Sequence, residues 1–390
     1  MTRAGARFRR VEPRRRAGAF VLGLLAGLPR KNCWTIAEHA GDATPDGMQH
    51  LLARAKWDAD GVRDDVRGYV AEHLGDPRAV LVVDETGDLK KGSATAGVQR
   101  QYTGTAGRVE NAQVAVYLGY AARRGHALID RELYLPKSWT SDPARCAAAG
   151  IPADVTFATK PQLARRMIER AVAAKVPFAW VAGDEVYGDN GLLRTWLEQQ
   201  HIAYVLAVAC DHRVPAGAGR TVRADELAAR LPRRAWQQLS AGDGAKGRRH
   251  YDWAWVTISH PAPRCRYLRI RRNRRTGEPA FYRCYSPDPV PPATLVQVAG
   301  RRWTSWYRWV TLAMLAAAVL TIAAVLESLR TPDPAGQIPL TRNEIARLFA
   351  GLTIKHPHDD RHRIRWSNWR RRHQHRAKTC HYQRQATQDP

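Results

Sequence analysis

Apolar and polar positions change their period along the chain, from helical spacing near the start to strand-like runs further on. Residues 18–75 carry Ala, Leu and Arg at helical spacing with Gly and Pro breaks, which predicts a group of helices. Ala79–Val83 and Phe178–Ala182 are short, continuous apolar runs, the pattern of strands buried on both faces. Further strands are predicted at Asn111–Ala121, His126–Tyr134 and Ile202–Ala209, and helices at Pro161–Lys175 and Gly191–Gln200. This order predicts an α/β protein with a mixed sheet.

The remainder of the chain divides into a strand-rich stretch and a helical end. Residues 211–293 are rich in Gly, Pro and Arg, with alternating runs that predict a β-rich insertion. Residues 331–339 read as a linker. The expected organisation is a helical N-terminal region (1–77), the first part of the core (78–210), the insertion (211–293), a C-terminal core helix (294–330), and a linker with a basic tail (331–390).

The apolar run Val310–Leu326 is interrupted only by Thr311 and Thr321. It is at the lower length limit for a membrane span, so a buried core helix is the preferred interpretation and no membrane association is expected.

Charge narrows the choice of partner. The chain of 390 residues holds 62 Lys+Arg against 36 Asp+Glu, a formal net charge of +26. Residues 1–31, 264–275 and 355–390 carry net +8, +7 and +7, so the rest of the molecule is nearly neutral. Basic blocks of this kind follow a polyanion, and nucleic acid is the first candidate. The plainer alternative is a solubilising surface in a protein with a strong Arg bias.

Six cysteines are scattered without a Cys-x-x-Cys pair, which argues against a zinc ribbon and against a secreted disulfide framework.

Two aspartates are the main candidates for chemistry. Asp84 and Asp184 each follow a buried apolar strand, where loops at the carboxyl ends of strands build sites in α/β folds. Carboxylates on adjacent strands suit Mg²⁺, and two-metal phosphodiester chemistry needs such a pair. A single aspartate at a strand end is more often a cap or a turn former.

Other residues suggest contacts with DNA or a different enzyme class. Asp84-Glu85-Thr86, Lys160 and Asp184 with Asp189 loosely match the haloacid-dehalogenase-type phosphatase pattern, although Thr86 stands where that pattern has a second Asp. Candidate DNA contacts are Lys90, Lys91, Arg301, Arg302, Arg370, Arg371 and Arg372. The Gly97–Gly107 stretch next to the two lysines is expected to be a loop, and Arg301–Trp309 interleaves cations with aromatic residues that suit stacking on bases.

Several blocks resemble bacterial insertion-sequence DDE transposases, also described as DDE superfamily endonucleases. The blocks that carry the resemblance are Val82–Gly92, Gly97–Gly107, Leu128–Thr140, Phe157–Pro161 and Trp180–Gly188. The resemblance implies an RNase H-like core with a β-rich insertion. It also implies Mg²⁺- or Mn²⁺-dependent cleavage at transposon ends followed by strand transfer, with Asp84 and Asp184 as the first two catalytic acids.

The resemblance further implies that the partners are the inverted-repeat ends of the transposon and target DNA. A homodimer is left open. The expected location is the bacterial cytoplasm, in association with the nucleoid.

The chain departs from the family pattern where the third catalytic acid, a Glu, is expected. Gly300–Trp303 runs directly into Thr304–Leu315, and no Asp or Glu occurs between Asp288 and Glu327. Neither Glu185, read as a strand residue pointing to the opposite face, nor Glu327, at the far end of a long helix, is an obvious substitute. No third catalytic acid is therefore identified, which predicts a decayed, inactive copy. The rival hypothesis is a non-catalytic DNA-binding remnant that inhibits an intact transposase.

Overall fold

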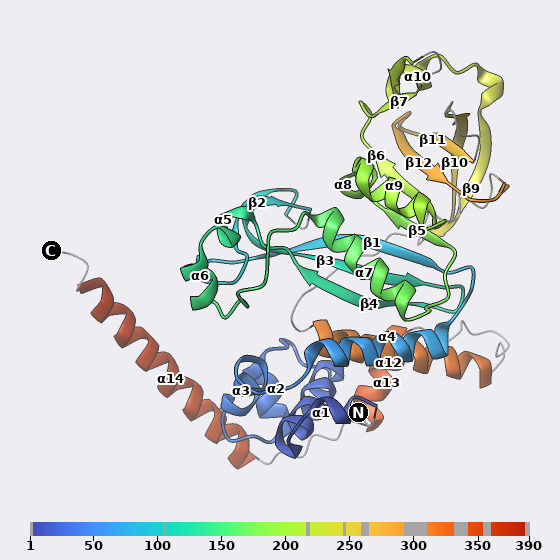
Figure 1. Cartoon of the computed structure of the whole chain (residues 1–390). Helices are drawn as coiled ribbons and strands as arrows, with labels where there is room; N and C mark the ends of the chain where they lie inside the picture. The colour runs from blue at the N-terminus through green and yellow to red at the C-terminus, as the bar shows by residue number, and fades with distance from the viewer. Residues whose placement is uncertain are drawn as a thin grey trace. The chain divides into compact units, whose positions relative to one another are not determined.

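The computed structural model describes residues 3–104, 106–215, 219–244, 247–258, 265–291, 310–330, 342–353 and 360–386. Two compact units divide the chain (Figure 1). One comprises Met1–Val66 together with Arg308–Pro390, and the other comprises Arg67–Tyr307.

The first unit is helical, as the spacing of apolar residues predicts. Its elements are the short turn η1 (Gly5–Arg7), α1 (Val11–Leu25), α2 (Cys33–Ala40), α3 (Asp46–Ala53), α12 (Val310–Arg330), α13 (Arg342–Leu348), the π-helical turn η3 (Phe349–Thr353) and α14 (Asp360–Ala386). Helix α4 (Ala59–Leu74) begins in this unit and ends in the other. The core of the helical unit contains Phe20, Ile36, Met48 and Leu51, which are fully or almost fully buried.

The start of α14 belongs to that core. Trp366 is fully buried, and its indole N–H donates to the carbonyl of Asp42 over 2.8 Å. His362 contacts the carbonyl of Glu38 through Nε2 at 3.0 Å, and Arg370 donates to the Glu38 carboxylate at 2.5 Å. The first half of this basic segment is therefore a structural part of the helical unit, whereas residues 371–380 are exposed.

No helix among the described residues has the length and apolar character needed to cross a membrane.

The second unit is built on one large mixed sheet. Its strands run in the order β2-β3-β1-β5-β6-β12-β11-β10-β9, and β4 pairs with β3. Their bounds are β1 Val80–Leu89, β2 Gln99–Thr103, β3 Arg108–Ala121, β4 His126–Leu133, β5 Trp180–Gly183, β6 Ala203–Val208, β9 Gln237–Gly244, β10 Gly247–Thr257, β11 Arg266–Asn273 and β12 Pro279–Tyr285. β1, β5 and β6 are parallel, and β3 is antiparallel to β1. The β4-β3-β1-β5-β6 part is the RNase H-like core that the resemblance implies.

The strand-rich stretch continues this core sheet. β12 pairs with β6 in antiparallel register from Phe281↔Val208 to Tyr285↔Tyr204, and β11, β10 and β9 follow outward. A separate ribbon of β7 (Arg213–Pro215) and β8 (Thr221–Arg223) lies next to α10 (Ala224–Ala229) and the short turn η2 (Arg233–Ala235). One expectation needs correction, because the Gly97–Gly107 stretch contains strand β2, which pairs with β3, and is not a loop throughout.

Three helices pack on β3, β4 and β6 of the core sheet. α7 (Lys160–Ala173) lies against β3 and β4, and α8 (Glu185–Gly188) and α9 (Gly191–Gln199) lie against β6 (Figure 1). α5 (Lys137–Thr140) and α6 (Pro143–Ala148) follow β4. The approach of α8 to β6 requires glycine at position 188, since a Cβ there would lie 1.7 Å from the carbonyl oxygen of Ala207.

A buried carboxylate ties β4 to two helices. Asp130 is fully buried and accepts two bonds from the guanidinium of Arg170, at 2.8 and 3.0 Å. Arg67 lies 3.4 Å from the same carboxylate, and Arg170 also reaches Glu132 at 2.7 Å. Asp130 thus links α7 and the end of α4 to β4 through two guanidinium groups.

We expect Asp130→Ala to lower the free energy of unfolding by roughly 3–5 kcal/mol, because two guanidinium groups lose a buried counter-ion. Urea denaturation measures the change. Arg108→Ala, which removes an exposed pair with Glu110 on β3, is the control and should stay within about 0.5 kcal/mol of wild type. Equal effects of the two substitutions would contradict the assigned role of Asp130.

Candidate metal centre

Parallel pairing of β1 with β5 determines where the two candidate aspartates lie. The register runs from Val80↔Trp180 to Val83↔Gly183, so Asp84 and Asp184 follow directly on paired residues. β5 ends at Gly183, and Asp184 becomes the N-cap of α8, its Oδ1 accepting the N–H of Val186 at 3.0 Å. The Oδ1 of Asp84 accepts the N–H of Glu85 at 2.8 Å.

A third carboxylate joins this pair. Asp84, Glu85 and Asp184 can each offer an oxygen so that all three oxygens lie within 4.8 Å of one another. Glu85 is half-buried and held on both sides: the Nζ of Lys160 donates to its Oε1 at 2.6 Å, and the hydroxyl of Tyr187 donates to its Oε2 at 2.7 Å. The cluster therefore has three acids and one ammonium group in contact with it.

The close approach of these carboxylates changes their ionisation. Burial, with the charge of Glu85 adding to it, raises the pKa of Asp184 from its ordinary value of 3.8 to about 6. Tyr187 is completely buried, and burial next to Glu85 raises its pKa well above the ordinary value, so it stays a neutral hydroxyl donor. A divalent cation among the three oxygens would favour their charged forms, and carboxylate oxygens are the ligands that Mg²⁺ and Mn²⁺ accept.

Glu185 and Glu327 were rejected in the sequence analysis as replacements for the third catalytic acid, and the structure places Glu185 in a different element from the one expected. It is the exposed first residue of α8 and not a strand residue, because β5 has already ended at Gly183, so the expectation from strand alternation was wrong. Glu327 lies on α12 in the helical unit.

Asp189 belongs to a different contact. Its carboxylate meets Nδ1 of His212 at 2.6 Å and accepts the N–H of Ala209 at 3.2 Å. The acid that the phosphatase pattern would recruit is therefore engaged with the loop after β6.

Some of the candidate DNA-contacting side chains are held in ion pairs, and others are exposed to solvent. Lys90 is paired with Asp88, whereas Lys91 is exposed. Arg370 is held by Glu38, and Arg371 and Arg372 are exposed on α14. Arg301 and Arg302 lie outside the described residues.

The residues that complete the cluster were not predicted from the sequence, namely Glu85 as a member and Lys160 and Tyr187 as the groups that hold it. The sequence nevertheless contains patterns that could have indicated Lys160 and Tyr187. Lys160 is the first residue of α7, capped by Thr159 through a capping box, and its position directs the ammonium group to Glu85 on β1. Tyr187 lies three residues after Asp184 in a helical turn, which returns its side chain to the strand end.

The geometry and the sequence comparisons point to one class of protein. The model of the DDE superfamily endonucleases matches residues 6–258, and the chain belongs to this family, whose members generally use divalent metal ions. The chain is 29% identical over 195 residues to a protein of Microchaete diplosiphon described as "Probable transposase for insertion sequence element IS701". That match covers 50% of this chain and 48% of the relative, so the chain aligns with about half the relative's length.

The raised pKa of Asp184 gives a prediction about stability. Folding strengthens proton binding at this group, so its contribution to stability is present below pH 4 and is lost as pH rises towards about 6. Asp184→Asn should therefore raise the melting temperature of the metal-free protein at pH 7.5 by roughly 2–5 °C and change it little at pH 4.

The same melting curves test the metal centre. Mg²⁺ at about 100 times its dissociation constant should stabilise the wild type by roughly 2.7 kcal/mol, because it binds only the folded state. Asp84→Asn and Asp184→Asn should abolish this gain, and the exposed Asp154→Asn should keep it. An equal response to Mg²⁺ in all four proteins would place the ion elsewhere.

Proposed function

We propose that this chain is a DNA-binding transposase that recognises the inverted-repeat ends of its element and target DNA, holds a divalent ion on Asp84 and Asp184, and has lost strand cleavage. The observation that carries the proposal is the carboxylate pair that follows directly on the parallel-paired residues of β1 and β5 in an RNase H-like sheet. The basic blocks at 1–31, 264–275 and 355–390 supply the attraction to the phosphate backbone.

Each residue of the centre has a task that its contacts support. Asp84 and Asp184 provide oxygen ligands, and their backbone contacts fix the direction of both carboxylates. Lys160 and Tyr187 hold the Glu85 carboxylate beside the two aspartates, where its negative charge adds to the electrostatic attraction of a cation. Bound Mg²⁺ would polarise a phosphodiester oxygen and lower the pKa of an attacking water.

The proposed loss of cleavage follows from the absence of a third acid in the sequence between Asp288 and Glu327. Glu85 is a poor replacement because the ammonium group of Lys160 offsets much of its charge and Tyr187 holds its other oxygen, which makes it a weaker ligand than Asp84 and Asp184. Two-metal displacement needs anionic ligands for both ions, one at the attacking and one at the leaving oxygen. With Glu85 engaged, the remaining pair serves one ion.

We expect the purified protein to bind duplexes carrying the element's ends but to cut or join them no faster than Asp84→Asn in Mg²⁺ or Mn²⁺. Denaturing gels of end-labelled duplexes measure the products. Metal-dependent nicking that Asp84→Asn abolishes would refute the loss of cleavage. In that event Glu85→Gln identifies whether Glu85 acts as the third acid.

The exposed half of α14 gives a second prediction, about binding. Substituting Arg371, Arg372 and Arg376 by Gln should reduce the slope of log affinity against log salt concentration by about 0.9 for each phosphate that the variant no longer neutralises. This triple variant is preferable to deleting the segment, since deletion also removes buried Trp366. Fluorescence anisotropy of a labelled duplex measures the slope.

The control for the α14 variant is Arg230, Arg233 and Arg234→Gln, three exposed arginines on the other unit that remove the same charge. Equal slopes for the two triple variants would make α14 a solvated surface without a particular role in DNA binding.

A further inference from the structure

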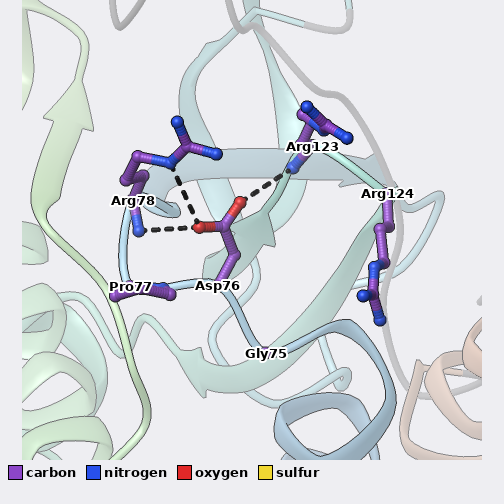
Figure 2. Close-up of a pocket in the computed structure, with 6 residues that line it drawn as sticks. All are labelled: Gly75, Asp76, Pro77, Arg78, Arg123 and Arg124. Carbon is purple, nitrogen blue, oxygen red and sulfur yellow. Dashed lines mark hydrogen bonds and ion pairs between the residues drawn. The ribbon is translucent and has the colours of Figure 1, made fainter.

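Two turns of the sheet unit enclose a pocket that is separate from the metal centre. It has a volume of about 260 Å³ and is lined by Gly75–Arg78, from the turn between α4 and β1, and by Arg123 and Arg124, from the turn between β3 and β4 (Figure 2). It therefore lies where β1 begins, whereas Asp84 and Glu85 lie in the middle of that strand.

Main-chain contacts hold the two turns together. Asp76 accepts the backbone N–H of Arg78 at 2.8 Å and that of Arg123 at 3.4 Å. The buried hydroxyl of Tyr120 bonds to the N–H of Asp76 and to the carbonyl of Pro177, both at 2.8 Å. The backbone of the pocket is thus fixed without help from the arginine side chains.

The charges around the pocket are unbalanced. Three arginines and a single carboxylate line it, and both oxygens of the carboxylate already accept backbone N–H groups. The side chain of Arg78 is 80% exposed and reaches Asp76 only at 3.8 Å, and Arg123 and Arg124 are exposed too. Figure 2 shows Arg78 and Arg123 extending to the same side of Asp76, with Arg124 directed away from them.

Such an arrangement suits a phosphodiester. Guanidinium groups present planar, paired donors that match phosphate oxygens, and a fixed backbone reduces the entropy cost of binding. Arg124 points away from the other two, so the three residues fit successive phosphates along a backbone better than one isolated anion.

The location of the pocket fits a duplex that also reaches the metal centre. Arg78 lies in the turn just before β1, and Val80 and Asp84 are four residues apart on that strand, which corresponds to roughly 13 Å at about 3.3 Å per residue. Duplex DNA advances about 3.4 Å per base pair, so a duplex of roughly four base pairs or more covers that span. A contact at this distance can fix the register of DNA without reading its sequence.

We propose that Arg78, Arg123 and Arg124 form a phosphate subsite that holds the backbone of duplex DNA at the end of β1 remote from the metal centre. This inference rests on the proposed DNA-binding function and adds a specific surface to it, outside the three basic blocks of the sequence.

The test uses the full chain with Arg78, Arg123 and Arg124 replaced by Gln, compared with wild type and with Arg230, Arg233 and Arg234→Gln. Both variants remove three exposed charges from the same unit. The pocket variant should fold normally, because the turn is held by backbone groups and Asp76, and thermal melting checks this. Anisotropy of a 30-base-pair duplex is measured from low to moderate salt, with inorganic phosphate added at constant ionic strength in a second series.

The subsite predicts that the salt slope of the pocket variant falls by about 1.8–2.7 relative to wild type, since two or three phosphates are no longer neutralised, while the control falls by less than about 0.9. Equal slopes for the two variants, with steep binding by the wild type, would overturn the subsite and leave the proposed function standing. An absence of salt-dependent binding by the wild type would overturn both.

The phosphate series separates DNA from a free anion. Saturable binding of millimolar inorganic phosphate that disappears only in the pocket variant, with the duplex slope unchanged, would mean that the pocket takes a free anion and would overturn the DNA assignment. The single substitutions Arg78→Gln and Arg124→Gln test whether the two side chains, which point in different directions in Figure 2, contact different phosphates. If the three residues follow a backbone, each substitution should lower the salt slope by about 0.9.

Discussion

The parallel pairing of β1 with β5 is the constraint on which the rest of the site depends. Four residue pairs, from Val80↔Trp180 to Val83↔Gly183, bring together segments that are a hundred residues apart in the chain. Asp84 and Asp184 come directly after these pairs, so their proximity is a consequence of register. A shift of one residue would turn one carboxylate to the other face of the sheet, because side chains alternate along a strand.

The pairing also creates an electrostatic cost that the surrounding residues reduce. Burial raises the pKa of Asp184, and the negative charge of Glu85 adds to this effect, so the charged form of the cluster is disfavoured. Lys160, placed by the capped start of α7, and Tyr187, placed by α8, each neutralise or solvate part of Glu85. The close packing of Gly188 against Ala207 fixes α8, and with it Tyr187, over β6. These supports make an otherwise repulsive cluster compatible with folding and keep it available to a cation.

Much of this arrangement could be predicted from the sequence, and the reasons are local. The apolar runs before Asp84 and Asp184 marked two buried strands, and the order of strands and helices indicated a mixed sheet with an insertion. Glu85 could not be found in this way, since strand alternation assigns it to the face opposite Asp84. It joins the cluster because β5 stops at Gly183 and leaves Asp184 beyond the strand end, within reach of both.

Other features could not be predicted from the sequence because they depend on contacts between residues that are far apart in the chain. The burial of Trp366 against Asp42 could not be read from a segment whose composition is dominated by Arg and His. The arginine pocket depends on Asp76 joining two turns that are distant in sequence, and nothing near Arg78 indicates Arg123. Local patterns thus predicted the elements, although β1 continues to Leu89 and does not end before Asp84 as expected, whereas contacts between distant turns required the structure.

The claim that Asp84 and Asp184 share one cation is tested most directly by anomalous diffraction from crystals of the protein grown with Mn²⁺. We expect one manganese peak between Asp84 in the middle of β1 and Asp184 at the end of β5, with an oxygen of each aspartate at a bonding distance of about 2.0–2.3 Å. A peak that contacts only one of the two carboxylates, or manganese bound away from this strand end while the site stays empty at saturating Mn²⁺, would contradict it.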